Sequence, residues 1–206
     1  MKNGSVLMWH PPMPVAFNLI EADRHRARGV NARAKVMNSL QQRDEENTYG
    51  PSATARTVID CIFDLQTAVL CSFLAIESLA NHAIETLPTG TTLSYKNKTY
   101  DKGQMVRWLG TDDKLKRVFR LLDGGEQIAG TNTWGRYLAL KDLRDELVHI
   151  KERGLRTDAD DPSAYDRLML GEADSCVEDA VAVVEGAWPG FLPPHVRKAL
   201  RLPVPT

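Results

Sequence analysis

The chain has 206 residues, of which 43% are hydrophobic and 26% are charged, and its formal net charge is −1. This composition suits one globular domain and lacks the strong basic excess of a dedicated nucleic-acid domain. The richest apolar run, 68–76, is far shorter than the roughly 20 residues of a membrane-spanning helix, so no membrane partner is expected. Residues 1–14 lack the apolar segment of a signal peptide, which predicts a cytoplasmic protein.

Apolar periodicity and the positions of Gly and Pro predict a mainly helical chain with one small hairpin. The first helix is expected over 15–47, and Gly29 marks a point where it can break. The alternating segment 93–100 predicts a hairpin with its turn at Asn97-Lys98. Further helices are expected over 54–87, 104–109, 112–122, 134–151, 164–170 and 176–187, with a last helical turn after Pro194.

The helix predicted over 54–87 is the most apolar segment and should form the centre of a bundle. Its apolar residues recur three or four positions apart, which indicates a wide buried face. Glu77 continues this stripe, where a carboxylate needs a cationic partner. We expect Arg144 to be that partner and Asn81, one turn beyond Glu77, to hydrogen-bond the same group. The stripe comprises Ile59, Ile62, Phe63, Val69, Leu70, Phe73, Ala80 and Ile84.

Charge is distributed unevenly along the chain. Residues 158–185 hold nine acidic side chains against Arg167 alone, so this region sums to −8 and the remainder to +7. We therefore expect the two parts to face different environments. The three cysteines, Cys61, Cys71 and Cys176, lack the paired spacing of a metal site, which predicts buried structural thiols.

The segment 144–149, Arg-Asp-Glu-Leu-Val-His, is the one constellation with chemical content. On an ideal helix Arg144 lies at the edge of the core-facing stripe and His149 points nearly opposite it. The two can address one phosphate only if the guanidinium reaches round or if a second surface, such as a symmetric dimer supplies, completes the cleft. Asp145 precedes His149 by four residues and is expected to orient its imidazole. The stripe consists of Leu140, Leu143, Leu147 and Ile150.

A purely structural alternative explains the same residues as an exposed histidine and an ion-paired arginine on a solvated helix face. Spacing alone does not separate the two interpretations. The chain has no HExxH, paired CxxC, Gly-rich phosphate loop or GxSxG, so zinc peptidase, zinc finger, P-loop nucleotidase and hydrolase functions lack support. Neither a metal nor a cofactor is expected, and the other histidines are assigned no role.

Arg144, Asp145 and His149 resemble the motif of the HEPN superfamily of helical-bundle proteins. Ribonucleases of that superfamily carry an Arg, then a polar residue, and a His roughly four to six residues beyond the Arg. Further resemblance lies in segments 75–81, 95–100 and 134–151, so it covers roughly residues 54–152. The implied fold is an all-α antiparallel bundle with a small hairpin insertion and extra N- and C-terminal helices.

The resemblance implies metal-independent RNA cleavage at a cleft formed by two subunits. His149 would act as general acid or base and Arg144 would hold the scissile phosphate. Asp145, Glu77 and Asn81 would support these two. The expected products are a 2′,3′-cyclic phosphate and a 5′-hydroxyl. The chain departs from many family members by having Asp rather than Asn after the Arg.

We expect one domain over 1–206, with an N-terminal helical extension (1–53), a HEPN-like core (54–152) and an acidic C-terminal helical region and tail (153–206). The first hypothesis is an endoribonuclease, a toxin or defence effector that binds RNA, forms a homodimer and is restrained by an antitoxin or regulatory protein. The second is a non-catalytic HEPN-like module that binds RNA or a nucleotide, or only dimerises. A third is a helical scaffold in which Glu77 and Arg144 form a buried ion pair.

Overall fold

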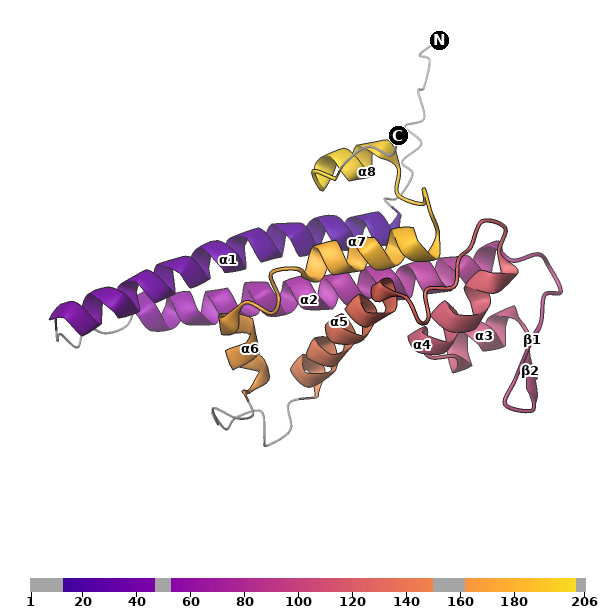
Figure 1. The fold of residues 1–206 in the computed structure, drawn as a ribbon, viewed down its shortest axis with the longest axis horizontal. Helices are drawn as coiled ribbons and strands as arrows, with labels where there is room; N and C mark the ends of the chain where they lie inside the picture. The colour runs from indigo at the N-terminus through magenta and orange to yellow at the C-terminus, as the bar shows by residue number, and fades with distance from the viewer. Residues whose placement is uncertain (1–12, 47–52, 150–161, 203–206) are drawn as a thin grey trace, which may run out of the picture.

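The computed structural model describes residues 13–46, 53–149 and 162–202, and two long antiparallel helices form its longest dimension (Figure 1). These helices are α1 (Pro14–Glu46) and α2 (Ala53–Thr86). One two-stranded sheet is the exception to a mainly helical structure in these ranges, which confirms the all-α class. The further elements are β1 (Leu93–Tyr95), β2 (Lys98–Tyr100), α3 (Lys102–Trp108), α4 (Thr111–Asp113), η1 (Lys114–Val118), η2 (Phe119–Leu121), α5 (Asn132–Val148), α6 (Ala164–Leu170), α7 (Cys176–Ala187) and α8 (Pro194–Ala199).

The seam between α1 and α2 depends on a glycine. A Cβ placed on Gly29 would lie 2.7 Å from the side chain of Leu65, which is fully buried in α2. The Cys61 thiol donates to the Gly29 carbonyl oxygen at 3.4 Å. Helix α1 runs through Gly29 without a break. The residue that the sequence marks as a helix breaker therefore serves close packing of two helices.

Helix α2 is the central element, as predicted, because α1, α3, η1, α5, α6 and α7 all contact it. By length and composition alone Ala55–Thr86 could cross a membrane, and 44% of its most apolar window is buried inside the structure. The core helix of a soluble protein passes the same test. This apolar helix is thus weak evidence for a membrane partner.

The predicted apolar stripe of α2 is buried only in part. Phe73, Ala80 and Ile84 belong to the core, whereas Ile59 and Phe63 are 66% and 62% exposed. The prediction is wrong for these two residues. Helical periodicity gives the direction in which a side chain points, but it does not say whether another element covers that direction.

Ion pairs connect the acidic C-terminal region to the rest of the chain. Three arginines of α1 and α5 pair with its carboxylates: Arg33 with Asp174, Arg26 with Glu178 at 3.6 Å and Arg136 with Asp179 at 3.2 Å. The Arg33 side chain is only 14% exposed. The expectation that the acidic region and the rest face different environments is therefore wrong, because much of the excess charge is matched across the fold.

The predicted hairpin is present, with β1 and β2 antiparallel and Tyr95 paired with Lys98. Its turn lies at Lys96 and Asn97, one residue earlier than predicted, and both have positive φ, 49° and 57°. Consecutive left-handed residues are what a tight two-residue hairpin turn requires. After α3, the segment expected as one helix divides into α4, a five-residue π-helix (η1) and a 3-10 turn (η2).

The cysteines are structural thiols, as predicted. Cys61 and Cys176 are buried, Cys71 is half-buried, and all three are free. Burial raises the pKa of each thiol, that of Cys176 to about 12. Reactive cysteines need the opposite shift toward thiolate.

Candidate functional site

Helix α5 carries the segment 144–149. Thr131 caps its start by accepting a hydrogen bond from the Trp134 amide at 3.4 Å. The predicted stripe is confirmed at Leu140, Leu143 and Leu147, which are buried, while Ile150 lies outside the described residues. Helix α5 ends at Val148, three residues earlier than predicted.

His149 is the C-cap of α5 and is exposed. Its backbone leaves the helical region, with φ −110° and ψ 60°, so the ideal-helix angle expected for its side chain does not apply. The contact with Asp145 runs through the main chain, where the His149 amide donates to the Asp145 carbonyl oxygen at 2.9 Å. In the described part of the chain, no side-chain hydrogen bond joins His149 to Asp145.

Arg144 lies at the edge of the core, as predicted, and its side chain is 28% exposed. The guanidinium carbon is 4.9 Å from the centre of the Phe73 ring on α2. Its Nη1 donates to Asp145 Oδ1 at 2.8 Å, and Lys141 Nζ donates to Asp145 Oδ2 at 2.9 Å. Asp145 thus bridges two cations instead of orienting the imidazole.

The environment of Asp145 alters its acidity. Partial burial alone would raise the pKa of this carboxyl group, but hydrogen bonds from Lys141 and Arg144, together with their charges, outweigh burial and hold the pKa below its ordinary value. The same contact with Asp145 raises the pKa of Lys141. The group is therefore a carboxylate at neutral pH, and it compensates part of the positive charge on this face of α5.

Glu77 and Asn81 do not contact Arg144 in the way the sequence predicted. Glu77 Oε1 accepts from the Thr111 hydroxyl at 3.3 Å, and Asn81 Oδ1 accepts from Lys114 Nζ at 2.7 Å. Within the described residues no ion pair joins Glu77 to Arg144. The cation beside Glu77 is Lys114, which comes from η1, an element whose position the sequence did not predict.

Lys114 is buried, with 7% of the residue exposed. Its ammonium group also donates to the Val106 carbonyl oxygen at 3.0 Å, so it ties η1 to both α2 and α3. Burial lowers the pKa of Lys114, and the charge of Glu77 opposes that shift. Through its two hydrogen bonds Lys114 holds η1 against α2 and α3.

Tyr137 is a residue that the sequence reasoning missed. It is fully buried on α5, and its hydroxyl donates to Asp112 Oδ1 at 2.5 Å. Burial, the bond to Asp112 and the nearby charges of Asp112, Glu77 and Asp145 all raise the pKa of the phenol. The sequence feature that could have predicted its burial is its position one turn before Leu140, on the same apolar stripe. Tyr137 therefore connects α4 to the helix that carries Arg144.

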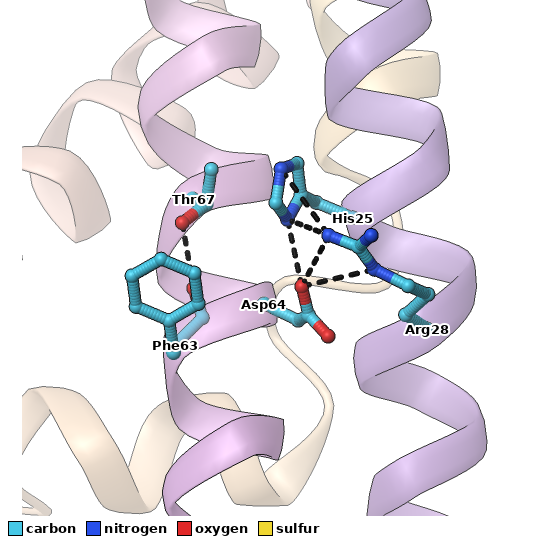
Figure 2. A network of polar contacts seen from close by, with 5 residues as sticks. All are labelled: His25, Arg28, Phe63, Asp64 and Thr67. Carbon is cyan, nitrogen blue, oxygen red and sulfur yellow. Dashed lines mark hydrogen bonds and ion pairs between the residues drawn. The ribbon is translucent and has the colours of Figure 1, made fainter.

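A second polar cluster lies at the seam of α1 and α2 (Figure 2). Asp64 Oδ1 is 2.7 Å from His25 Nδ1 and accepts from Arg28 Nη2 at 2.8 Å. The ring of Phe63 meets the His25 ring edge-on, with centroids 6.3 Å apart. His25 and Asp64 are 16% and 15% exposed, so little of either reaches solvent. The Asp64 carboxylate therefore pairs with both His25 and Arg28, and the cluster joins α1 to α2.

The two clusters differ in the chemistry they allow. On α5 a phosphate could reach Arg144 and Lys141, and an exposed imidazole lies at the end of the same helix. Among the described residues, no three or more His, Cys, Asp or Glu side chains come together in a way that could hold a metal ion.

Comparison of the chain with protein-family models, with curated proteins and with solved structures finds no match.

Proposed function

We propose that the protein is a HEPN-like, metal-independent endoribonuclease that acts as a homodimer, with Arg144 and His149 of each chain at the cleft between the subunits. The observation that carries this proposal is the position of the two residues on α5. Arg144 is held against Phe73 with its side chain 28% exposed, and His149 is exposed at the C-cap of α5, five residues further on.

In this mechanism His149 takes the proton from a ribose 2′-hydroxyl or delivers one to the leaving 5′-oxygen, because imidazole exchanges protons near neutral pH. The 2′-oxygen attacks the adjacent phosphorus, the bond to the 5′-oxygen breaks, and the products are a 2′,3′-cyclic phosphate and a 5′-hydroxyl. Arg144 stabilises the charge that develops on the phosphate oxygens. Asp145 holds Arg144 and Lys141 in place, while Glu77 and Asn81 bind Thr111 and Lys114 and so support the core next to α5 and not the reacting groups directly.

A second subunit is needed because the described contacts of one chain do not bring His149 and Arg144 together. Exposed apolar side chains beside the site support such an interface: Leu74 on α2 and Leu138 and Val148 on α5 are 43–47% exposed. Sedimentation should give a dimer. A protein that stays monomeric at micromolar concentration would contradict the two-subunit cleft.

The test is incubation of purified protein with total RNA in the presence of a chelator. Wild type should cleave and leave 5′-hydroxyl ends, and His149→Ala should not. The matched control is His195→Ala, since His195 is also exposed but lies on α8. Cleavage that persists in His149→Ala would refute the assigned mechanism.

A second function is favoured by the contact between Arg144 and Asp145. If this carboxylate keeps the guanidinium occupied, the protein is a non-catalytic module that binds RNA or a nucleotide. Binding without cleavage by wild type, and cleavage gained in Asp145→Asn, would support this alternative. A cytoplasmic nuclease would also need a restraining partner such as an antitoxin, which co-purification from its own cells would identify.

A further inference from the structure

One end of the molecule concentrates cations and aromatic rings. Residues 94–120 contain eight Lys and Arg against three Asp, a sum of +5. They belong to the hairpin, α3, α4, η1 and η2, which lie together beyond the N-terminal end of α5 (Figure 1). The eight are Lys96, Lys98, Lys102, Arg107, Lys114, Lys116, Arg117 and Arg120.

Cations and rings alternate across three neighbouring elements. The ring of Tyr95 on β1 has Lys96 Nζ at 4.9 Å from its centre and the Arg117 guanidinium of η1 at 3.8 Å. The next cation of η1, Lys116, lies 4.6 Å from the centre of the Trp134 ring at the start of α5. The π-helical segment thus directs two consecutive cations toward rings on two different elements. Short π-helical turns often occur at functional sites.

The charges of this end are less compensated than those elsewhere. Arg117 lies 3.7 Å from Asp113, but within the described residues Lys96, Lys98 and Lys116 have no carboxylate partner. By contrast, the α1 arginines Arg24, Arg26, Arg28 and Arg33 all have ion pairs. Trp108, in the last turn of α3, is 72% exposed, which offers a flat apolar face to solvent. The hairpin itself bears a hollow of ≈ 420 Å³ lined by residues 94–99.

Ring contacts through the core connect this surface to the proposed site, because Tyr137 and Phe73 are buried. The ring of Trp134 is 4.8 Å from that of Tyr137, which stacks on Phe73 at 6.0 Å, and Phe73 lies under Arg144. Trp134 and Arg144 are ten residues apart on one helix, about 15 Å along its axis. A bound strand of a few nucleotides would span that distance. Lys141 lies between the two, on the same side of α5.

We propose that the hairpin, Trp108 and η1 form a binding track for single-stranded RNA that leads along α5 to Arg144. Lysines without a carboxylate partner match a phosphate backbone, and the exposed ring of Trp108 matches an unstacked base, a combination typical of proteins that bind single strands. The choice of RNA as the strand rests on the proposed nuclease function. The residues that would hold the strand therefore lie on other elements than the reacting groups Arg144 and His149.

The experiment measures the binding of a short fluorescent RNA, 2′-O-methylated throughout so that no 2′-hydroxyl can attack, by anisotropy over a range of salt concentrations. The Lys96→Gln, Lys98→Gln double variant should raise Kd about 10-fold and reduce the salt slope by about 1.4, because two phosphate contacts to a single strand are lost. Lys35→Gln, at an exposed lysine of α1, is the charge control and should bind as wild type.

Trp108→Ala tests the stacking part of the track and should raise Kd about 10-fold. Its control is Leu170→Ala, since Leu170 on α6 is equally exposed, at 74%. Unchanged Kd in both track variants would overturn the proposal. So would duplex RNA or heparin that binds with the same Kd as the single strand and whose Kd is unaffected by Trp108→Ala. His149→Ala should bind normally. RNA binding that depends on the track without any cleavage would refute the nuclease alone, and cleavage with track-independent binding would refute the track alone.

Discussion

The two polar clusters of the protein contain similar residues but leave different amounts of charge exposed. At the seam of α1 and α2, His25 and Arg28 share the Asp64 carboxylate. On α5, Asp145 is likewise shared by Lys141 and Arg144. The first cluster joins the antiparallel helices α1 and α2. The second lies near a surface that carries one exposed ring, Trp108, and lysines without a carboxylate partner among the described residues. A carboxylate shared by two basic side chains therefore joins helices in one place, and in the other it lies beside a surface on which recognition is proposed.

The largest expected difference between the clusters is catalytic. Arg144→Ala should reduce RNA cleavage by about 100-fold or more, since removing one donor to a developing oxyanion typically has that effect. Arg28→Ala, which removes the corresponding arginine of the seam, should change cleavage less than about 2-fold because it lies outside the site. Initial rates on a defined single-stranded RNA would check this. Equal losses in both variants would erase the distinction.

A smaller effect, on stability, is expected at Lys114, the buried lysine of η1. Lys114→Met should lower the free energy of unfolding by about 2 kcal/mol, because the Asn81 side-chain oxygen and the Val106 carbonyl oxygen lose a donor. Chemical denaturation gives this value. Lys35→Met, at an exposed site, should be neutral. If Lys114→Met is as stable as wild type, relief from burying the ammonium offsets the lost bonds, and Lys114 does not hold this end together.

The smallest expected effect is a dependence on pH. The pKa of Asp145 is lower in the folded than in the unfolded protein, so its contribution is complete above the ordinary Asp pKa of about 3.9 and is lost as the pH falls through the lower, folded value. The stability advantage of wild type over Asp145→Asn should be about 0.5 kcal/mol at pH 7, because exposed ion pairs contribute little, and should vanish in strong acid. Asp60→Asn, at an exposed position, should show no such pH-dependent difference. A difference that grows toward low pH would reverse the assigned sign.

Much of the fold could be predicted from local pattern. Apolar spacing located α2, α6 and α7 to within a residue or two, and it placed the start of α5 at 134, two residues after the observed Asn132. The hairpin was located by its alternation, but its turn was misplaced by one residue because two overlapping dipeptides could form it. These features depend on residues close in the chain, where backbone geometry and side-chain direction are coupled.

The candidate site was less predictable. Arg144 and the stripe beside it follow from helical spacing, but its partner Asp145 is the adjacent residue rather than Glu77. Asp112 and Lys114 lie in a segment that divides into α4 and η1, and apolar periodicity did not predict that division. Their contacts join residues 25 and 33 positions apart. Such contacts depend on how elements dock, which a single helical period does not encode.

By itself, the sequence determined which segments are helical, which faces of them are apolar, and that Arg144 and His149 lie near the end of one helix. The tertiary structure decided which of those faces is covered, leaving Ile59 and Phe63 on the surface, and it matched the acidic region with arginines of α1 and α5. It also placed the cations of η1 against rings of the hairpin and α5. Charge and apolarity are properties of residues, whereas burial and pairing are properties of neighbours, and the neighbours here come from distant parts of the chain.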